Sequence, residues 1–445
     1  MKRRIGLGVL CGVVATTALP MPTRAAAQPP AHPPALHLHL CMSFPFGVAT
    51  QSALVNGIRR GIQMANGQWK SRMAAVGIAL DPPVALDNTG PDALAYGPDQ
   101  ERQDAEKCLA DKHAIAYIGG LRGGAAVVSE PILNEGGMLM ISPADPTPAL
   151  TDPALRATHE PATFAHRTKY LTFFRTVTSD VFVGPVAATF MSSALHIKSY
   201  FLVDDKHSVP GELALSFSRF AQRRLRMRQL AAGQIDPTSA ATIAETADAV
   251  TQQVASRRPP SLFYGGNPDE GGALLRRLRA RGWSAPFVGG DALFTQQFLT
   301  ANDTAATNLF VAGVGLDSAE AAATFQTAYH RYFPHKTLQP LDASAYDATG
   351  IILNAIYQAR HGGTLRGSIA AMRRSLLPIV AVMRYPGVTG TVAFDKNGDT
   401  VNRVVTVYRV RSSGWQPAGI AHILGTGGPQ QVTVSVSTVA SVRAR

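Results

Sequence analysis

The sequence predicts an α/β fold with two similar lobes, each built on a parallel central sheet covered by helices. Three observations lead to this prediction. Short apolar runs alternate with longer segments of helical periodicity, the alternation occurs in two successive series, and several short runs are followed by Gly, Ser, Thr or Asp. Because parallel strands need long crossover connections, such alternation implies parallel sheets with helices on both faces.

The first series covers about one hundred residues after a Pro-rich stretch. Its short apolar runs predict strands, at 36–42, 84–87, 114–118 and 138–141. The segments between them predict helices, at 51–69, 100–112 and 125–134. These elements form the core of the first predicted lobe.

The second series has the same organisation. Its short runs predict strands, at 199–204, 230–235, 261–264, 286–288 and 309–312. The intervening segments predict helices, at 211–228, 241–257 and 268–281. Three further helices are predicted with little strand between them, at 319–333, 344–359 and 365–376.

The C-terminal part returns to an alternating pattern. Residues 391–394 and 403–410 flank Asp395-Lys396-Asn397-Gly398-Asp399, whose composition favours a tight turn. We therefore predict a hairpin there. The tail from Gly425 is rich in Gly, Ser and Val, and we expect it to be loosely held.

Residues 1–27 have the organisation of a signal peptide. Lys2, Arg3 and Arg4 precede an apolar stretch at 5–18, and small residues at 25–27 suit a cleavage site. The apolar stretch is shorter than the ~18–20 residues of a membrane-spanning helix. We expect cleavage and export to the periplasm, which would lower the formal charge from +12 to +8 as Lys2, Arg3, Arg4 and Arg24 are removed.

Much of the remaining positive charge lies on predicted helices, in two groups around 219–228 and 276–281. No aromatic platform or nucleic-acid motif accompanies these groups, so we expect solvated helix faces and no nucleic-acid partner. Two cysteines follow the signal peptide, Cys41 in an apolar strand and Cys108 near a helix end. Export permits a disulfide, but we favour two separate buried thiols.

Ligand chemistry is expected beyond the carboxyl ends of the strands, where open parallel sheets bind their ligands. Three predicted strands are followed by loops rich in small and polar residues, at 43–47, 119–124 and 142–147. Glycine there frees backbone N–H groups, and a following helix N-terminus favours an anion. These loops predict one binding site at a shared sheet edge.

Several stretches in consistent order resemble the type I periplasmic solute-binding proteins, and most closely the leucine/isoleucine/valine-binding branch. The similarity extends over residues 36–410. The stretches that carry it include Ala116-Tyr117-Ile118-Gly119-Gly120, Gly136-Gly137-Met138-Leu139-Met140-Ile141-Ser142-Pro143-Ala144, Phe174-Arg175-Thr176 with Asp180, Phe263-Tyr264-Gly265-Gly266, Tyr346-Asp347-Ala348 and Gly390-Thr391-Val392-Ala393-Phe394-Asp395.

The resemblance implies two Rossmann-like lobes joined by a three-segment hinge, with crossovers near 175–180, 312–315 and 386–390. It implies that a small molecule is trapped by hinge closure and passed to the membrane permease of an ABC importer, with the chain acting as a monomer. The corresponding boundaries are 36–178 with 313–387 for lobe 1, 179–312 with 388–420 for lobe 2, and a tail at 421–445.

The resemblance also implies a set of ligand-binding positions. These are Gly123, Ala144, Pro146, Asp180, Val209, Asn267 and Asp291, to which the loop positions add Ser43, Phe46 and Arg122. The chain departs from amino-acid binders, which use hydroxyl side chains at Gly123 and Pro146 and often aromatic ones at Val209 and Asn267. Arg122 offers a replacement partner for a carboxylate, or else points into solvent. Asp291 stands where an acid meets the ligand's ammonium.

The ligand class therefore stays open between an amino acid, which is the family default, and a less polar aromatic acid or lipid-like molecule. Phe44, Phe46, Phe182 and Phe294 either make the cleft apolar or belong to the core. The long segment 151–170, with His159 and His166, is a candidate lid.

We predict no catalysis, because the sequence lacks the nucleophile elbow, the zinc-protease motif and the phosphate loop. No cofactor and no metal site are expected. The alternative to transport is a sensor, in which the same lobes report the ligand to a receptor.

Overall fold

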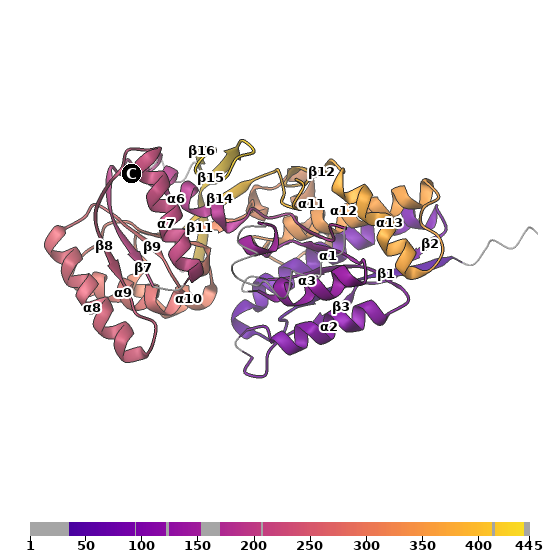
Figure 1. Ribbon diagram of the computed structural model, residues 1–445, viewed down its shortest axis with the longest axis horizontal. Helices are drawn as coiled ribbons and strands as arrows, with labels where there is room; N and C mark the ends of the chain where they lie inside the picture. The colour runs from indigo at the N-terminus through magenta and orange to yellow at the C-terminus, as the bar shows by residue number, and fades with distance from the viewer. Residues whose placement is uncertain are drawn as a thin grey trace, which may run out of the picture.

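The computed structural model describes residues 35–93, 95–121, 124–152, 170–205, 208–411 and 414–439, with the side chains of 208–212 outside this set. Two lobes lie side by side along the long axis of the molecule (Figure 1). Each lobe has its own central sheet, and the chain passes between them more than once. The predicted fold class is confirmed.

The sheet of lobe 1 is entirely parallel. Its order is β2-β1-β4-β5-β6, and β3 also pairs with β1. The strands are β1 (Leu36–Phe44), β2 (Ile78–Leu80), β3 (Val84–Asp87), β4 (Ala114–Gly119), β5 (Leu139–Ser142) and β6 (Phe173–Arg175).

Helices cover both faces of this sheet, as the alternation predicts. On one face lie α1 (Ser52–Ala74), α12 (Asp342–His361) and α13 (Ile369–Ala381), which share a core with Leu38 and Leu40 of β1. On the other face lie α2 (Pro98–Ala110) and α3 (Ala125–Glu135), packed against Cys41 and Tyr117. A Cβ at Gly61 of α1 would stand 2.3 Å from the Asp342 carbonyl oxygen, so only glycine allows α1 to approach α12 this closely.

The sheet of lobe 2 combines a parallel half with an antiparallel half. Its order is β16-β15-β14-β11-β10-β9-β7-β8, and the last five positions are parallel. The strands are β7 (Ser199–Asp204), β8 (Arg228–Gln234), β9 (Leu262–Gly265), β10 (Phe287–Gly289), β11 (Leu309–Val314), β14 (Val404–Arg411), β15 (Gly414–Leu424) and β16 (Thr433–Thr438).

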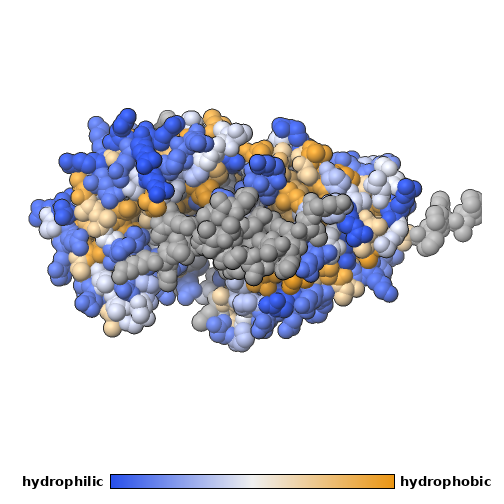
Figure 2. Space-filling model, in the orientation of Figure 1, coloured by the Kyte–Doolittle hydropathy of each residue, from blue (hydrophilic) through white to orange (hydrophobic). Residues whose placement is uncertain are grey.

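The helices of lobe 2 also divide between two faces. On one face α6 (Val183–Ser193) and α7 (Ser208–Arg223) contact each other, and on the other α8 (Ala240–Arg257) contacts α9 (Pro268–Ala280). The exposed positions of α7 include Arg219 and Arg223. Deep blue, which marks the most hydrophilic residues, gathers over this part of lobe 2 at the upper left of Figure 2.

Helix α6 is missing from the sequence prediction. Its residues from Val183 to Met191 are all buried, so no solvent-facing polar stripe marks this helix in the sequence. The three helices predicted after residue 312 are present as α11 (Ala323–Tyr332), α12 and α13. Of the helices that the structure describes, none is both long and apolar enough to cross a bilayer.

The predicted hairpin forms only beside its turn, where Phe394 bridges Thr400 antiparallel and the Val401 amide donates to the Ala393 carbonyl oxygen at 2.9 Å. The predicted pairing of 391–394 with 403–410 is wrong. A tight turn does form, because the Asp395 amide donates to the Asp399 carbonyl oxygen at 2.8 Å. The flanking strands then diverge: β13 (Gly390–Val392) pairs with β12 (Tyr385–Gly387), whereas β14 joins the sheet of lobe 2. The residue types of the turn indicate that the chain reverses direction. They do not indicate which strand the segment on each side of the turn pairs with.

The expectation of a loosely held tail is wrong for Thr433–Thr438. These residues form β16, which pairs along β15 at the edge of the lobe 2 sheet. Short polar alternation of Thr, Ser and Val is compatible with both a solvated tail and an edge strand. The pairing partner decides between them.

The interpretation of Cys41 and Cys108 as separate thiols is wrong. A disulfide joins them, across a sequence separation of 67 residues, between β1 and α2. Alternation along β1 turns Cys41 towards the face that α2 covers, which the sequence alone did not establish.

Removal of this disulfide should destabilise lobe 1. A cross-link that closes a loop of this length reduces the number of conformations open to the unfolded chain. Such bonds stabilise proteins by about 2–4 kcal/mol. Urea denaturation should therefore give a lower midpoint when a reductant is present. The Cys41→Ala/Cys108→Ala variant should have the lower midpoint with and without reductant, and an unchanged midpoint would contradict a stabilising disulfide.

Candidate functional site

The first two hinge crossovers start at the carboxyl edge of a central sheet, one in each lobe. The first crossover follows the carboxyl end of β6 at Arg175, and the second follows the carboxyl end of β11 at Val314. Beyond the carboxyl ends of β1 and β10 lie η1 (Ala49–Gln51) and α10 (Gln296–Ala301), which contact each other across the lobes. The carboxyl edges of the two sheets therefore face a shared region beside the hinge.

The loop after β5 is attached to the first crossover and brings three predicted site residues together. The Asp180 amide donates to the Pro146 carbonyl oxygen at 3.0 Å. Ala144 is fully buried in the same loop and forms an isolated bridge with Leu121 beyond β4. A change in the backbone conformation of the first crossover would therefore move this loop directly.

Arg175 holds that loop from the hinge side. Its guanidinium is fully buried and donates to the carbonyl oxygens of Thr147 at 2.7 Å and Asp145 at 3.4 Å, and to the Thr151 hydroxyl. Its Nε pairs with Asp399 Oδ1 at 2.6 Å, in the tight turn of the third crossover. From the sequence, Arg175 is expected only to begin the first crossover, and no contact of its side chain is predicted.

All three crossovers converge on the start of β14. The Val404 carbonyl oxygen accepts from the Thr178 hydroxyl at 2.7 Å and from the Gly315 amide at 3.0 Å. Gly315 has φ +86°, which favours glycine at this position. One backbone carbonyl thus receives hydrogen bonds from the first two crossovers where the third enters lobe 2.

Residues 386–390, where the third crossover is expected, contact helix α12 of lobe 1. The amides of Val388 and Thr389 donate to the Asp347 carboxylate of α12 at 2.8 and 2.9 Å, so these residues belong with lobe 1. Residues 393–403 follow β13 and lead into β14 of the lobe 2 sheet. Burial raises the pKa of Asp347 to about 6.

Lobe 2 places acidic and amide groups at the carboxyl ends of three adjacent strands. Asp205 follows β7 and accepts from the backbone N–H and Nδ2 of Asn267 after β9, both at 2.8 Å. Asp291 follows β10 and is mostly buried, with an exposed fraction of 7%. Val209 lies in the first turn of α7, and its side chain is outside the described residues.

The first strand presents its predicted residues differently. Ser43 faces α2, where its hydroxyl lies 2.9 Å from Glu101 Oε2 and 2.8 Å from Asp104 Oδ2. Phe46 is half-buried, edge-on to Phe44 and 5.6 Å from the Arg59 guanidinium. The Ser43 side chain therefore points into the interior of lobe 1, whereas Phe46 lies near the carboxyl edge that faces lobe 2.

Glu101 is the centre of a buried polar cluster. It also accepts from Asn88 Nδ2 at 2.6 Å and from the Tyr117 hydroxyl at 3.1 Å. Burial raises the pKa of Glu101 to about 7 and also raises the pKa of Asp104. The single hydroxyl proton of Ser43 cannot be donated to Glu101 and Asp104 at the same time. The arrangement therefore fits a protonated carboxyl group on one of these two residues.

Asp145 is a further candidate that the sequence analysis does not single out. It is fully buried between Ala144 and Pro146, and its Oδ1 accepts from the Thr147 amide at 3.0 Å. Its Oδ2 makes no hydrogen bond among the described residues. Burial raises the pKa of this carboxyl group.

The remaining predicted features have other locations. Arg122, Gly123 and most of the candidate lid, including His159 and His166, lie outside the described residues. Phe44, Phe182 and Phe294 belong to the buried cores, and Phe294 stacks on Tyr408. The described part of the chain contains no group of three His, Cys, Asp or Glu side chains placed for a metal ion.

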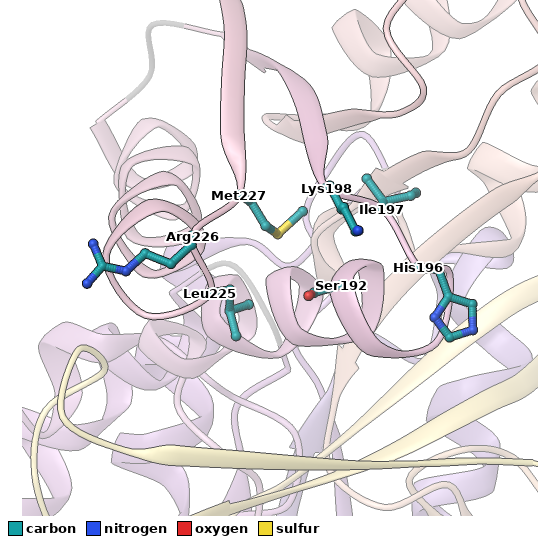
Figure 3. Close-up of a pocket in the computed structure, with 7 residues that line it drawn as sticks. All are labelled: Ser192, His196, Ile197, Lys198, Leu225, Arg226 and Met227. Carbon is teal, nitrogen blue, oxygen red and sulfur yellow. The ribbon is translucent and has the colours of Figure 1, made fainter.

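Two cavities lie away from the carboxyl edges. One is bounded by α12 and α13 in lobe 1, around Val382 and Met383. The other is at the opposite end of the lobe 2 sheet, around Lys198 and Met227 (Figure 3). Neither coincides with the predicted ligand-binding residues.

Two α/β lobes joined by a three-segment hinge, with polar loops at facing sheet edges, are the architecture of the type I periplasmic binding proteins. Residues 94–415 match the model of the periplasmic binding protein family, and the chain belongs to this family. It is a family of exported periplasmic solute-binding proteins rather than of enzymes.

Known proteins of this class are similar but distant. The Leu/Ile/Val-binding protein BraC3 of Rhizobium johnstonii is 23% identical over 317 residues, which cover 70% of this chain and 77% of that protein. The leucine binding protein LivK of Thermotoga maritima superposes with a TM-score of 0.64 at 18% identity, covering 86% of this chain and 98% of that one. A solute binding protein of R. palustris in complex with benzoate gives 0.61 at 15% identity, covering 86% and 96%.

Replacement of Arg175 by alanine should destabilise the protein by about 3–5 kcal/mol, because it leaves Asp399 and two carbonyl oxygens without their buried partner. Urea denaturation measures this change. Arg277→Ala breaks a more exposed pair with Asp248 and is the matched control, with an expected cost of about 0–1 kcal/mol. Equal effects of the two substitutions would argue against a special role for Arg175.

Glu101 should make stability depend on pH. Its pKa is raised from 4.5 to about 7, so the folded state binds the proton more tightly than the unfolded chain. This contribution is present below pH 4.5 and is lost as the pH rises through 7. Glu101→Gln should flatten the decline of Tm over this range, whereas Asp99→Asn, exposed on the same helix, should leave it unchanged. An unaltered decline in Glu101→Gln would refute the assignment.

Proposed function

We propose that the protein captures a small molecule between its lobes and delivers it, chemically unchanged, to the permease of an ABC importer. The observation that carries the proposal is the attachment of loop 144–147 to the hinge through Arg175 and Asp180. Membership of the periplasmic binding protein family supports it. Relatives whose names describe leucine binding and ABC transport support it as well.

Closure follows from ligand contacts on both walls. A ligand that touches lobe 1 and lobe 2 together binds the closed arrangement more tightly and shifts the population towards it. The contact between η1 and α10 is one that closure forms or tightens. Because loop 144–147 is bonded to the first crossover, ligand contact with this loop is transmitted to the hinge.

The two walls suit a ligand with an amine and an apolar body. On the lobe 2 side Asp291 and Asp205 supply carboxyl groups, and we assign the ligand's ammonium to Asp291. On the lobe 1 side Pro146 stands where amino-acid binders use a hydroxyl side chain, and Ala144 beside it is apolar as well. Phe46 adds a half-buried ring. We therefore propose an amino acid or a related, more apolar small molecule, bound also by Asn267, Asp180 and the Arg122–Gly123 segment.

The same proposal includes the cellular route. Residues 1–27 direct export and are cleaved, and the mature chain works as a monomer in the periplasm.

A thermal-shift screen of amino acids, aromatic acids and lipids tests the proposed function. A ligand at ~100 times its dissociation constant adds ~2.7 kcal/mol to stability. Amino-bearing ligands should raise the Tm of the wild type, and Asp291→Asn should weaken their binding about 10- to 100-fold, since a hydrogen bond to a charged group contributes about 1.5–3 kcal/mol.

The matched control is Asp303→Asn, an exposed acid near the other end of the lobe 2 sheet. It should bind as tightly as the wild type. Equal affinity of Asp291→Asn and wild type would discard the ammonium assignment. Chemical conversion of any compound in the screen would discard the binding-protein proposal itself.

A further inference from the structure

The amino edge of the lobe 2 sheet, opposite the ligand edge, collects exposed cations. Each of the four turns that lead into β7, β8, β9 and β10 contributes at least one. The exposed basic residues of these turns are His196, Lys198, Arg223, Arg224, Arg226, Arg228, Arg257, Arg258 and Arg281. We call this set the cationic edge.

Sheet topology makes the cationic edge continuous. The strands β8, β7, β9 and β10 are neighbours and parallel, so their amino ends lie side by side. Ser199 pairs with Arg228, and the Arg228 amide donates to the Lys198 carbonyl oxygen at 2.9 Å. The first two turns are therefore in direct contact.

Acidic residues are segregated from this edge. Asp303 is the single acid on the described turns that lead into β7–β11. Other acids of lobe 2 follow the strands at the carboxyl edge, namely Asp204, Asp205, Asp236, Asp269, Glu270 and Asp291. None of the described cations of the edge forms an ion pair. Their charge is left for an external partner.

Backbone conformation gives independent support. His196, Arg226 and Arg258 have φ values of +55°, +57° and +45°, in the left-handed region where glycine is favoured. The fourth turn does use glycine, Gly282, at φ +76°. Basic residues near helix C-termini complement the helix dipole, but that effect does not require a cation at the strained position itself.

A cavity of about 270 Å³ opens within the cationic edge, between its first two turns. Ile197, Leu225 and Met227 give it an apolar floor. In Figure 3, His196 and Arg226 stand on opposite sides of this group of residues, and Lys198 and Ser192 lie between them. A cationic rim over an apolar floor fits an anionic headgroup attached to carbon.

We propose that the cationic edge docks onto an anionic phospholipid surface, with a headgroup phosphate in this cavity. A protein partner would be expected to meet an apolar, aromatic-rich centre, whereas the exposed side chains of these turns are largely basic. A lipid surface needs only additive contributions from many cations. Docking by this edge leaves the opposite, carboxyl edge free for ligand.

Vesicle co-sedimentation tests the proposal with the mature protein. Vesicles of phosphatidylcholine and phosphatidylglycerol should bind it, vesicles of phosphatidylcholine alone should not, and added salt should weaken binding by screening. The variant Arg223→Ala/Arg224→Ala/Arg226→Gly should lose on the order of a hundredfold in partitioning, at about fivefold for each cation. Glycine is chosen at 226 because of its left-handed backbone.

The matched control, Arg331→Ala/Lys336→Ala/Arg366→Ala, removes the same charge from exposed positions of lobe 1. It should partition nearly as the wild type does, and the Tm of both variants reports that they fold. Equal loss in the two variants would overturn the proposal, as would retention by heparin without vesicle binding. If the protein does not bind the vesicles, the result of the ligand screen still stands, because the ligand is proposed to bind at the opposite, carboxyl edge.

Discussion

The buried Arg175 guanidinium is the interaction on which the two-lobed arrangement depends most. It joins the first crossover to the third through Asp399, and both to the loop after β5 through the carbonyl oxygens of Asp145 and Thr147. A buried cation is tolerated only when its donors find partners, and here a carboxylate, carbonyl oxygens and a hydroxyl supply them. The geometry of the crossover and of the loop is thus fixed together.

In lobe 2 the acidic and the basic residues lie at opposite ends of the helices. Acids gather where strands end and helices begin, and cations gather where helices end and strands begin. The helix dipole favours this polarity. One consequence is a carboxyl edge able to receive a cationic group, and another is an amino edge that repels one. The same fold therefore presents two surfaces of opposite character at its two ends.

Local patterns in the sequence determined much of the architecture. Period and length place β1, β4, β7 and α8 to within a few residues, because strand and helix periodicities differ strongly. Helix α6 could not be found in this way, since its residues from Val183 to Met191 are all buried. The pairing predicted between 391–394 and 403–410 failed for a different reason, because the turn is local but the partners of the two strands are not.

The sequence by itself determined the fold class, the family and the loops at the sheet edges, because periodicity, turn residues and motif order are local properties. Only the tertiary structure decided the Cys41–Cys108 bond, the interior orientation of Ser43 and the role of Arg175. Each depends on residues far apart in sequence meeting at bonding distance. Such meetings follow from how sheets and crossovers pack, which no single segment encodes.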